Sequence, residues 1–355
     1  MIPAVGTPQA EAVSALSSFD GLARGDAAPA WIRDGVVGAW GLDPGAEVAL
    51  VVLSENVTFA VRIGGSARMI VRLGRPGYAA TTDHIRSELV WVDALRRDIG
   101  APTPAPIRGA DGDLVQLLGD PDGRDWTAVA FDFVAGSALE DRPDVAAHFR
   151  EIGALTARLH EHARAWRPPA GFTRFAWATS DMVGPSARWG DWSRAPLAGP
   201  DAALLGRAQL RALEALDAAG ISARDARHWG LIHADLRPSN VMSDGSRMSI
   251  IDFDDCGYGF YLYDFAAALT FYEHRPEAAG MAADWLGGYR EVRALGADEI
   301  ARAAALSMLR RLTMLGWQTT HRSDALPPDL WDENQPGTVE VAARYLEDPL
   351  WLVRG

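Results

Sequence analysis

The spacing of apolar residues changes along this chain, and the change constrains the fold more than any other feature of the sequence. In the first third, short β-branched runs at 47–53, 57–63 and 69–73 are separated by tight-turn signals such as Gly64-Gly65. Three such runs predict an antiparallel meander. Later in the chain, apolar residues recur at helical spacing, which predicts helices at 144–162, 201–219, 281–293, 297–317 and 339–346. The sequence therefore predicts an α+β protein with a small antiparallel sheet and a larger, mostly helical part.

We expect the boundary between the two parts at Gly136. Helical spacing at 82–98 predicts the main helix of the first part. Two further strands are expected before the boundary, at 114–118 and 127–134. Residues 1–135, with an N-terminal helical segment, thus form one predicted lobe, and residues 136–355 form the other.

Residues 172–197 show neither the short apolar runs of strands nor the apolar spacing of a helix. They hold large aromatic side chains among glycines and prolines, namely Phe172, Phe175, Trp177, Trp189 and Trp192. Two interpretations are open for this segment. It is either an irregular cover that packs the helical lobe or the wall of a binding cleft.

Composition excludes several classes of function. Arginine supplies all 34 basic residues, so the chain has no lysine for a phosphate-binding loop of the Gly-Lys-Ser/Thr type or for a Schiff base. The formal net charge of -13 argues against a nucleic-acid partner and suits a cationic small molecule. The single cysteine, Cys256, is typical of a reducing compartment, and no window approaches the apolar length of a membrane span. We expect a cytoplasmic protein without a membrane or nucleic-acid partner.

The clearest chemical signal is the spacing His233-x-Asp235-x-x-x-x-Asn240, followed by Asp252. Short apolar strands on either side of Asp244-Gly245-Ser246 predict a hairpin that brings Asp252 close to Asn240. A carboxylate and an amide oxygen are suitable ligands for magnesium, and Asp235 would remain available to accept a proton from an attacking hydroxyl. These are the groups that phosphoryl transfer needs. The competing interpretation is a buried hairpin whose aspartates only cap turns.

The segments HADLRPSN and IDFDD resemble the catalytic loop and the metal-binding turn of the aminoglycoside phosphotransferase and choline kinase superfamily, which has a protein-kinase-like fold of two lobes. The resemblance implies that residues 1–135 bind the nucleotide and that residues 136–355 hold the catalytic loop and the acceptor. It also implies ATP and Mg²⁺ as cofactors, with Asp235 as catalytic base and Asn240 and Asp252 as metal ligands.

The same resemblance gives structural roles to neighbouring residues. His233 becomes a prop for the catalytic loop rather than a proton shuttle, and Asp264, in LYDFA, steadies that loop from the next helix. Asp254 either supports the metal site or caps a turn.

Arginine stands at both positions where kinase-like proteins usually present lysine to phosphate. Arg72, on the strand MIVRL, matches the lysine that binds the α- and β-phosphates of ATP, and Glu88 is its expected partner. Arg237 follows Asp235 by two residues and is expected near the γ-phosphate or the acceptor. For each of these side chains the competing interpretation is an ordinary surface residue.

The remaining nucleotide contacts are predicted by position. The turn after the first strand lacks a G-x-G-x-x-G sequence, so Ser54 and Asn56 are expected to meet phosphate through side-chain and main-chain donors. The stretch FDFVAG resembles the linker between lobes, where main-chain groups of Asp132 and Val134 would bind the edge of adenine.

These features predict a kinase that transfers the γ-phosphate of ATP to a hydroxyl of a small polar or cationic molecule, such as an amino sugar, an amino alcohol or homoserine. Three alternatives remain open. The first is a protein serine/threonine kinase of the bacterial stress-response type. The second is a nucleotide-binding pseudokinase without turnover, because the usual lysine is missing. The third is a metal-dependent hydrolase that uses the Asp/His cluster.

Overall fold

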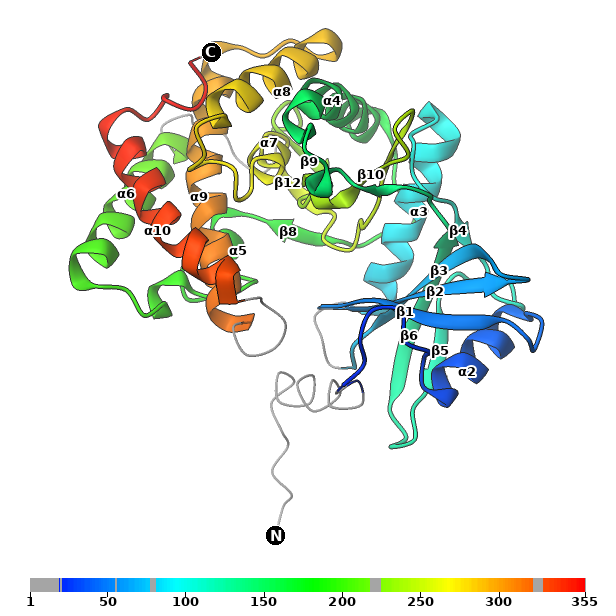
Figure 1. Cartoon of the computed structure of the whole chain (residues 1–355). Helices are drawn as coiled ribbons and strands as arrows, with labels where there is room; N and C mark the ends of the chain where they lie inside the picture. The colour runs from blue at the N-terminus through cyan, green and yellow to red at the C-terminus, as the bar shows by residue number, and fades with distance from the viewer. Residues whose placement is uncertain are drawn as a thin grey trace. The chain divides into compact units, whose positions relative to one another are not determined.

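The computed structural model describes residues 19, 21–54, 56–76, 81–217, 225–321 and 328–354 (Figure 1). These residues group into two compact units. One unit takes its residues from 19–96, 103–135 and 169–173, and the other from 97–102, 136–168 and 174–354. The assignment of nucleotide binding to one lobe and of catalysis to the other stays a prediction. The sequence predicts an N-terminal helical segment without bounds, and the described residues before the first strand include the helix Ala30–Trp40.

The first unit is built on a six-stranded sheet in which β1, β2, β3, β6 and β4 are neighbours in that order and β5 pairs with β6. All the pairs are antiparallel. The strands are β1 (Glu47–Leu53), β2 (Asn56–Ile63), β3 (Ser66–Gly74), β4 (Pro106–Ile107), β5 (Gln116–Gly119) and β6 (Asp125–Asp132). The meander β1–β2–β3 is the one that the sequence predicts.

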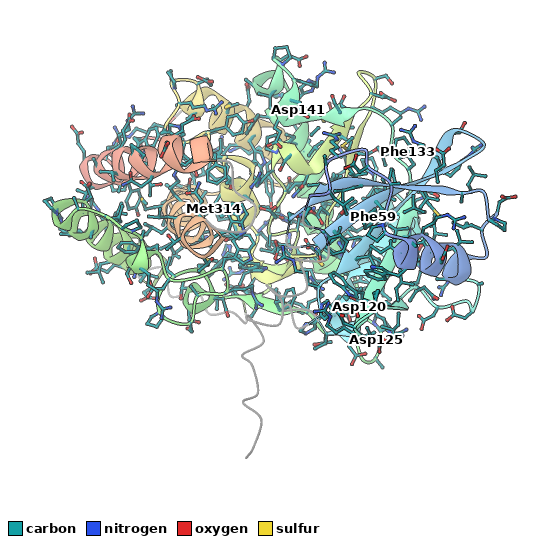
Figure 2. All side chains as sticks on the ribbon, turned by 60° about the horizontal axis from the view of Figure 1, so that its bottom comes forward. Phe59, Asp120, Asp125, Phe133, Asp141 and Met314 are labelled. Atoms are coloured by element: carbon teal, nitrogen blue, oxygen red, sulfur yellow. The ribbon has the colours of Figure 1, made fainter. Side chains whose placement is uncertain are left out.

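Helices α2 (Ala30–Trp40) and α3 (Thr82–Ile99) pack against this sheet. Alternate residues of β6 contact different clusters, because side chains alternate across a strand. Trp126, Ala128 and Ala130 belong to the core cluster that includes α2, whereas Val129 packs with Leu89 of α3. Phe59 lies within the α2 cluster, and Asp120 and Asp125 lie at the β5–β6 turn (Figure 2).

The sequence predicts bounds for α3 but only a helical segment without bounds before β1, where α2 lies. Its sequence AWIRDGVVGAW is short and contains two glycines, and only Ile32, Val36 and Trp40 are buried. Gly41 ends the helix in a left-handed conformation with φ of 59°.

The second unit is mostly helical, as predicted. Its longer helices are α4 (Phe149–Ala165), α6 (Gly199–Asp217), α8 (Ala278–Val292), α9 (Ala297–His321) and α10 (Pro328–Glu347), and its short helices are α5 (Thr179–Met182) and α7 (Tyr263–Ala268). Short 3₁₀ turns occur at Leu139–Asp141, Val145–His148, Trp192–Arg194 and Pro238–Asn240. Helices α4 and α8 lie side by side (Figure 1). Met314 belongs to α9, the long central helix of this unit (Figure 2).

Two small sheets position the loops that follow β9 and β11. In one, β10 (Val241–Ser243) lies between β11 (Met248–Ile250) and β7 (Ser137–Ala138). In the other, β12 (Gly257–Phe260) lies between β8 (Phe175–Trp177) and β9 (Trp229–Ile232). The predicted hairpin around Asp244-Gly245-Ser246 is therefore present as β10–β11. Among the helices in the described part of the chain, none has the length and apolar character needed to cross a lipid bilayer.

Candidate active site

A buried carboxylate accepts hydrogen bonds from the main chain of the loop that follows β9. Asp264, on α7, is fully buried and accepts hydrogen bonds from the main-chain N–H of His233 at 3.0 Å and of Ala234 at 2.7 Å. Ala234 has φ of 68°, a conformation that non-glycine residues adopt only when the surroundings require it. The hydrogen bonds of Asp264 thus fix the turn that leads into Asp235.

Asp264 is itself part of a buried chain of hydrogen bonds. His160 Nε2 lies 3.0 Å from Asp264 Oδ2, and His160 Nδ1 lies 2.9 Å from the Tyr289 hydroxyl. Burial lowers the pKa of His160 and raises that of Tyr289, so both side chains are neutral near pH 7. A neutral imidazole that donates from Nε2 to Asp264 then accepts at Nδ1 from the Tyr289 hydroxyl.

His233 supports the loop from inside. Its side chain is fully buried against the Phe253 ring, with ring centroids 4.4 Å apart. Its Nε2 lies 3.1 Å from the carbonyl oxygen of Ile251, and its Nδ1 lies 3.4 Å from the main-chain N–H of Asp235. The ring therefore connects the loop after β9 to the end of β11, which is the structural role expected for it.

The Asp235 carboxylate is held at both oxygens. Asn240 donates from Nδ2 to Asp235 Oδ2 at 2.8 Å and to the Asp235 main-chain oxygen at 2.9 Å. Arg310, on α9, donates from Nη2 to Asp235 Oδ1. About a fifth (19%) of the Asp235 side chain is still exposed, so the group remains accessible.

Asn240 and Asp252 come together through the β10–β11 hairpin. The main-chain N–H of Ile251 donates to the Asn240 carbonyl at 2.9 Å, so Asp252 directly follows a residue that is bonded to Asn240. Asp252 is exposed and has φ of 62°, a left-handed conformation. Because the Asn240 Nδ2 group already donates twice to Asp235, its Oδ1 is the atom left to act as a ligand.

These two oxygen donors fit a magnesium ion that takes its other ligands from phosphate and water. The described residues contain no cluster of three or more His, Cys, Asp or Glu side chains of the kind that a metal bound by protein alone would need. The assignment of Asn240 and Asp252 as metal ligands stays a prediction.

The turn after Asp252 is held by side chains from 174–177. The Arg174 guanidinium donates to the main-chain oxygens of Asp254 and Cys256, and Trp177 donates from Nε1 to the Asp255 oxygen at 2.8 Å. Trp177 is fully buried and stacks on Tyr263. This part of the irregular segment 172–197 is therefore packing that supports the turn after Asp252.

Arg237 is half-buried rather than an exposed surface residue. It donates from Nε to the Ser239 hydroxyl at 3.1 Å, and its guanidinium lies 5.5 Å from the centre of the Phe271 ring. Its Nη2 lies 3.9 Å from Glu140 Oε2, a long ion pair. Phe271 has φ of 69°, so an aromatic residue with a left-handed backbone lies beside this arginine.

In the first unit, Arg72 and Glu88 form a buried ion pair. Val71 and Leu73 of β3 belong to the α2 cluster, so the side chain between them points to the other face of the sheet, which α3 covers. Arg72 Nη2 lies 2.8 Å from Glu88 Oε1 and 2.7 Å from Oε2, and the side chains are 10% and 1% exposed. The interpretation as an ordinary surface pair is therefore excluded by burial, while phosphate binding stays a prediction.

The β1–β2 turn is held by an arginine that the sequence analysis missed. Arg75, which follows β3 and is buried, donates from its guanidinium to the Ser54 main-chain oxygen. The Ser54 N–H donates to the Asn56 oxygen at 2.9 Å. Glu55, between them, lies outside the described residues. Phosphate contacts by Ser54 and Asn56 stay predictions.

One hydrogen bond at the end of β6 limits which main-chain atoms of Asp132 could contact adenine. The main-chain N–H of Asp132 donates to the Ala105 oxygen at 2.9 Å, so a contact between Asp132 and adenine would need its carbonyl group. The corresponding prediction for the main chain of Val134 is unchanged.

The sequence analysis also missed Arg310 and Arg174. A signal for Arg310 was available, because Arg310-Arg311 interrupts the otherwise apolar stretch ALSMLRRLTML of a predicted helix. A charged pair on an apolar helix face indicates buried partners. Arg174 had no such signal, since its partners are main-chain oxygens some 80 residues further along the chain.

The chain is similar in sequence and fold to known phosphotransferases. Residues 51–295 match the phosphotransferase enzyme family. A homoserine kinase from Nitrobacter winogradskyi is 31% identical over 273 residues, which cover 72% of this chain and 70% of that protein. The structure of a microcompartment-associated aminopropanol kinase is 34% identical, covers 90% of this chain and 98% of that one, and superposes with a TM-score of 0.79. The amicoumacin kinase hAmiN, solved with AMP-PNP and Ca²⁺, shares the fold at 18% identity, with a TM-score of 0.68 and coverage of 92% and 95%.

The fold and the loops define a kinase-like phosphotransferase with an antiparallel sheet followed by a helical region. The chain belongs to the phosphotransferase enzyme family. It is an ATP-dependent kinase that phosphorylates a hydroxyl group of a small molecule, which confirms the first of the functions considered from the sequence. The family resemblance and the fold class predicted from the sequence are confirmed as well.

Proposed function

We propose that this enzyme transfers the γ-phosphate of ATP, with magnesium, to the hydroxyl of a short amino alcohol. The observation that carries the phosphotransfer part is the arrangement around Asn240. The Asn240 side-chain N–H₂ donates to Asp235, and the Asn240 main-chain oxygen accepts from the Ile251 N–H. Asn240 therefore joins the base, on the preceding loop, to the β10–β11 hairpin that leads to the Asp252 carboxylate.

Asp235 accepts the proton of the acceptor hydroxyl in this proposal, and Asn240 and Asp252 hold the magnesium ion. Bound magnesium would neutralise negative charge on the phosphates. Arg72, held by Glu88, binds the α- and β-phosphates, and Arg237 binds the transferred phosphate or the acceptor. Further nucleotide contacts come from Ser54, Asn56 and the main chain of Asp132 and Val134.

The charges near Asp235 support a cationic acceptor. Partial burial raises the pKa of Glu140; the Arg237 guanidinium opposes this shift, and the carboxylates of Asp141 and Asp235 add to it. Asp141 and Asp235 are therefore close enough to Glu140 to affect it, and a group of acidic side chains favours a protonated amine. The similarity to an aminopropanol kinase, which spans 98% of that chain, points to the same class of acceptor.

Homoserine is the second candidate, because a homoserine kinase is 31% identical to this chain. Its carboxylate would need a cation. Arg310 and Arg311 are both bonded to carboxylates of this chain, Asp235 and Glu273, so the homoserine carboxylate would have to use Arg237. The amino alcohol is the better candidate if Arg237 binds the transferred phosphate.

A panel of acceptors tests the proposal through ATP consumption, with product detection by mass spectrometry. We expect 1-amino-2-propanol and ethanolamine to be phosphorylated faster than homoserine, and faster than propane-1,2-diol, which lacks the amine. Equal rates with the diol would contradict amine recognition. Faster turnover of homoserine would assign the second candidate instead.

Asp235→Asn is the matched control for the chemical step. It should bind ATP, as measured by thermal stabilisation, but should not transfer phosphate to any acceptor. Retained turnover would overturn the assignment of Asp235 as base.

A further inference from the structure

The side chain of Arg310 is fully buried and makes four directed contacts. Its Nε donates to the Thr270 hydroxyl at 3.1 Å, and its Nη1 lies 3.2 Å from the Ala234 carbonyl and 3.3 Å from the Tyr263 hydroxyl. Its Nη2 donates to Asp235 Oδ1. The guanidinium is thus fixed by α7, by the start of the catalytic loop and by the segment after α7. Its Nη2 group is directed at Asp235.

The indole of Trp189 covers the guanidinium, with the Arg310 Cζ atom 4.7 Å from the ring centroid. The backbone holds this tryptophan segment close to α9, because a Cβ at Gly316 would lie 2.2 Å from the Gly190 oxygen. Thr320 also donates from its hydroxyl to the Trp189 oxygen at 2.8 Å. The plane of the Arg310 guanidinium is therefore covered by an aromatic ring, while its N–H groups make hydrogen bonds.

These contacts determine the plane of the Asp235 carboxylate. Arg310 binds Oδ1 and Asn240 binds Oδ2, and two donors on different oxygens leave the group little freedom to rotate. Each carboxylate oxygen has two acceptor sites, so the Asp235 carboxylate can still accept a proton. A base acts efficiently only when its lone pair is directed at the proton that it takes.

We propose that Arg310 is the positioning residue for the catalytic base, which it holds through Oδ1 while Asn240 holds Oδ2. The inference rests on the proposed role of Asp235 as base. Arg310 touches neither the nucleotide nor the acceptor in this proposal and acts only through Asp235, so its removal should lower kcat and leave KM nearly unchanged.

The next residue, Arg311, offers a matched control. It is equally buried on the same helix, but its guanidinium binds Glu273 at 2.8 Å, the Thr338 hydroxyl at 2.9 Å and the Asn334 oxygen at 2.9 Å. Replacing it removes a buried arginine without removing a contact to Asp235. Any loss of rate that is due only to a loosened α9 should therefore appear in both arginine variants.

The experiment compares Arg310→Met, Arg310→Lys and Arg311→Met by steady-state kinetics on protein shown to be folded by circular dichroism. For Arg310→Met we expect kcat to fall about 100-fold, the scale of a disabled general base. The KM values for ATP and acceptor should change less than about threefold, as for an interaction made only in the transition state. Lysine keeps one donor for Asp235 and should give an intermediate kcat. Arg311→Met should keep the parent kcat even if its melting temperature falls.

Chemical rescue separates positioning from packing. Arg310→Ala leaves space for a guanidinium, and added ethylguanidinium should raise its kcat about tenfold, whereas ethylammonium, which lacks the planar fork, should not. Rescue of Arg310→Ala also provides the test if Arg310→Met does not fold. A parent-like kcat in a folded Arg310 variant, or equal losses for Arg310→Met and Arg311→Met, would overturn the inference. Turnover by Asp235→Asn would instead overturn the assignment of the base.

Discussion

Asp264 accepts a hydrogen bond of 2.7 Å from the main-chain N–H of Ala234, the residue with a left-handed backbone that precedes Asp235. The same carboxylate binds the N–H of His233 and the ring of His160, and it is fully buried. The geometry of the loop that holds Asp235 therefore depends on a buried carboxyl group of α7, outside the loop.

Asp264→Ala should leave these donors without an acceptor and lower the free energy of unfolding by about 3 kcal/mol or more. Urea unfolding followed by circular dichroism measures the change. Asp284→Asn, at an exposed position on α8, is the control and should cost less than about 0.5 kcal/mol. Similar costs for the two variants would mean that Asp264 does not hold the loop.

Replacement of Arg72 should affect both stability and nucleotide binding. Arg72→Ala leaves Glu88 buried without its partner, which should cost about 3–5 kcal/mol. The Kd for MgATP should rise at least about tenfold. Arg72→Lys should retain part of both properties, because one ammonium can reach Glu88 but cannot reproduce the fork. Isothermal titration calorimetry measures the affinity.

The double variant Arg72→Met/Glu88→Leu separates these effects. Apolar residues of similar volume often replace a buried ion pair at little cost, so stability should return while the affinity for MgATP stays low. If the double variant binds MgATP as the parent does, Arg72 has no part in the nucleotide site.

The neutral state of His160 predicts a pH dependence of stability. Burial lowers the pKa of His160 in the folded protein, against the opposing effect of Asp264, whereas an unfolded histidine titrates at the ordinary value of 6.5. Below that pH the unfolded state binds more protons than the folded state, so stability falls as the pH falls. Burial lowers the pKa of His228 and His274 as well, and the sign of their effect is the same.

We expect the free energy of unfolding to fall by about 1 kcal/mol or more between pH 7.5 and 5.5. His160→Gln removes the titrating group and should flatten this slope, although the variant is less stable at pH 7.5. Urea unfolding across the pH range gives both quantities. An unchanged slope in His160→Gln would assign the pH dependence to other groups.

Two glycines of α8 should respond in opposite directions to alanine. A Cβ at Gly288 would lie 1.8 Å from the Arg150 oxygen of α4, so Gly288→Ala should separate the helices and cost about 3 kcal/mol. Nothing lies within 4 Å of a Cβ at Gly280, which is exposed, so Gly280→Ala should stabilise the protein by about 0.5 kcal/mol. Thermal and urea unfolding of the two variants measure the change in stability. Stabilisation by Gly288→Ala would contradict the close contact between α4 and α8.

Much of the fold could be predicted because the signals are local. The strands β1 and β2 alternate in burial over most of their length, and α3, α6 and α9 show helical periods. The hairpin signal at Asp244-Gly245-Ser246 is also local, and it sufficed to bring Asn240 and Asp252 together. The short strands β8, β9 and β12 were not predicted, because a few residues carry too little periodicity and pairing partners distant in sequence decide their conformation.

The sequence by itself determined which groups are available for chemistry: a carboxylate, an amide and a second carboxylate at fixed spacing, with arginine as the only strong cation. The family resemblance already paired Arg72 with Glu88, 16 positions further on, whereas only the tertiary structure showed that Arg310 reaches Asp235 across 75 positions. Such pairs are selected by burial, since a guanidinium removed from water must find an acceptor wherever the packed helices and strands provide one.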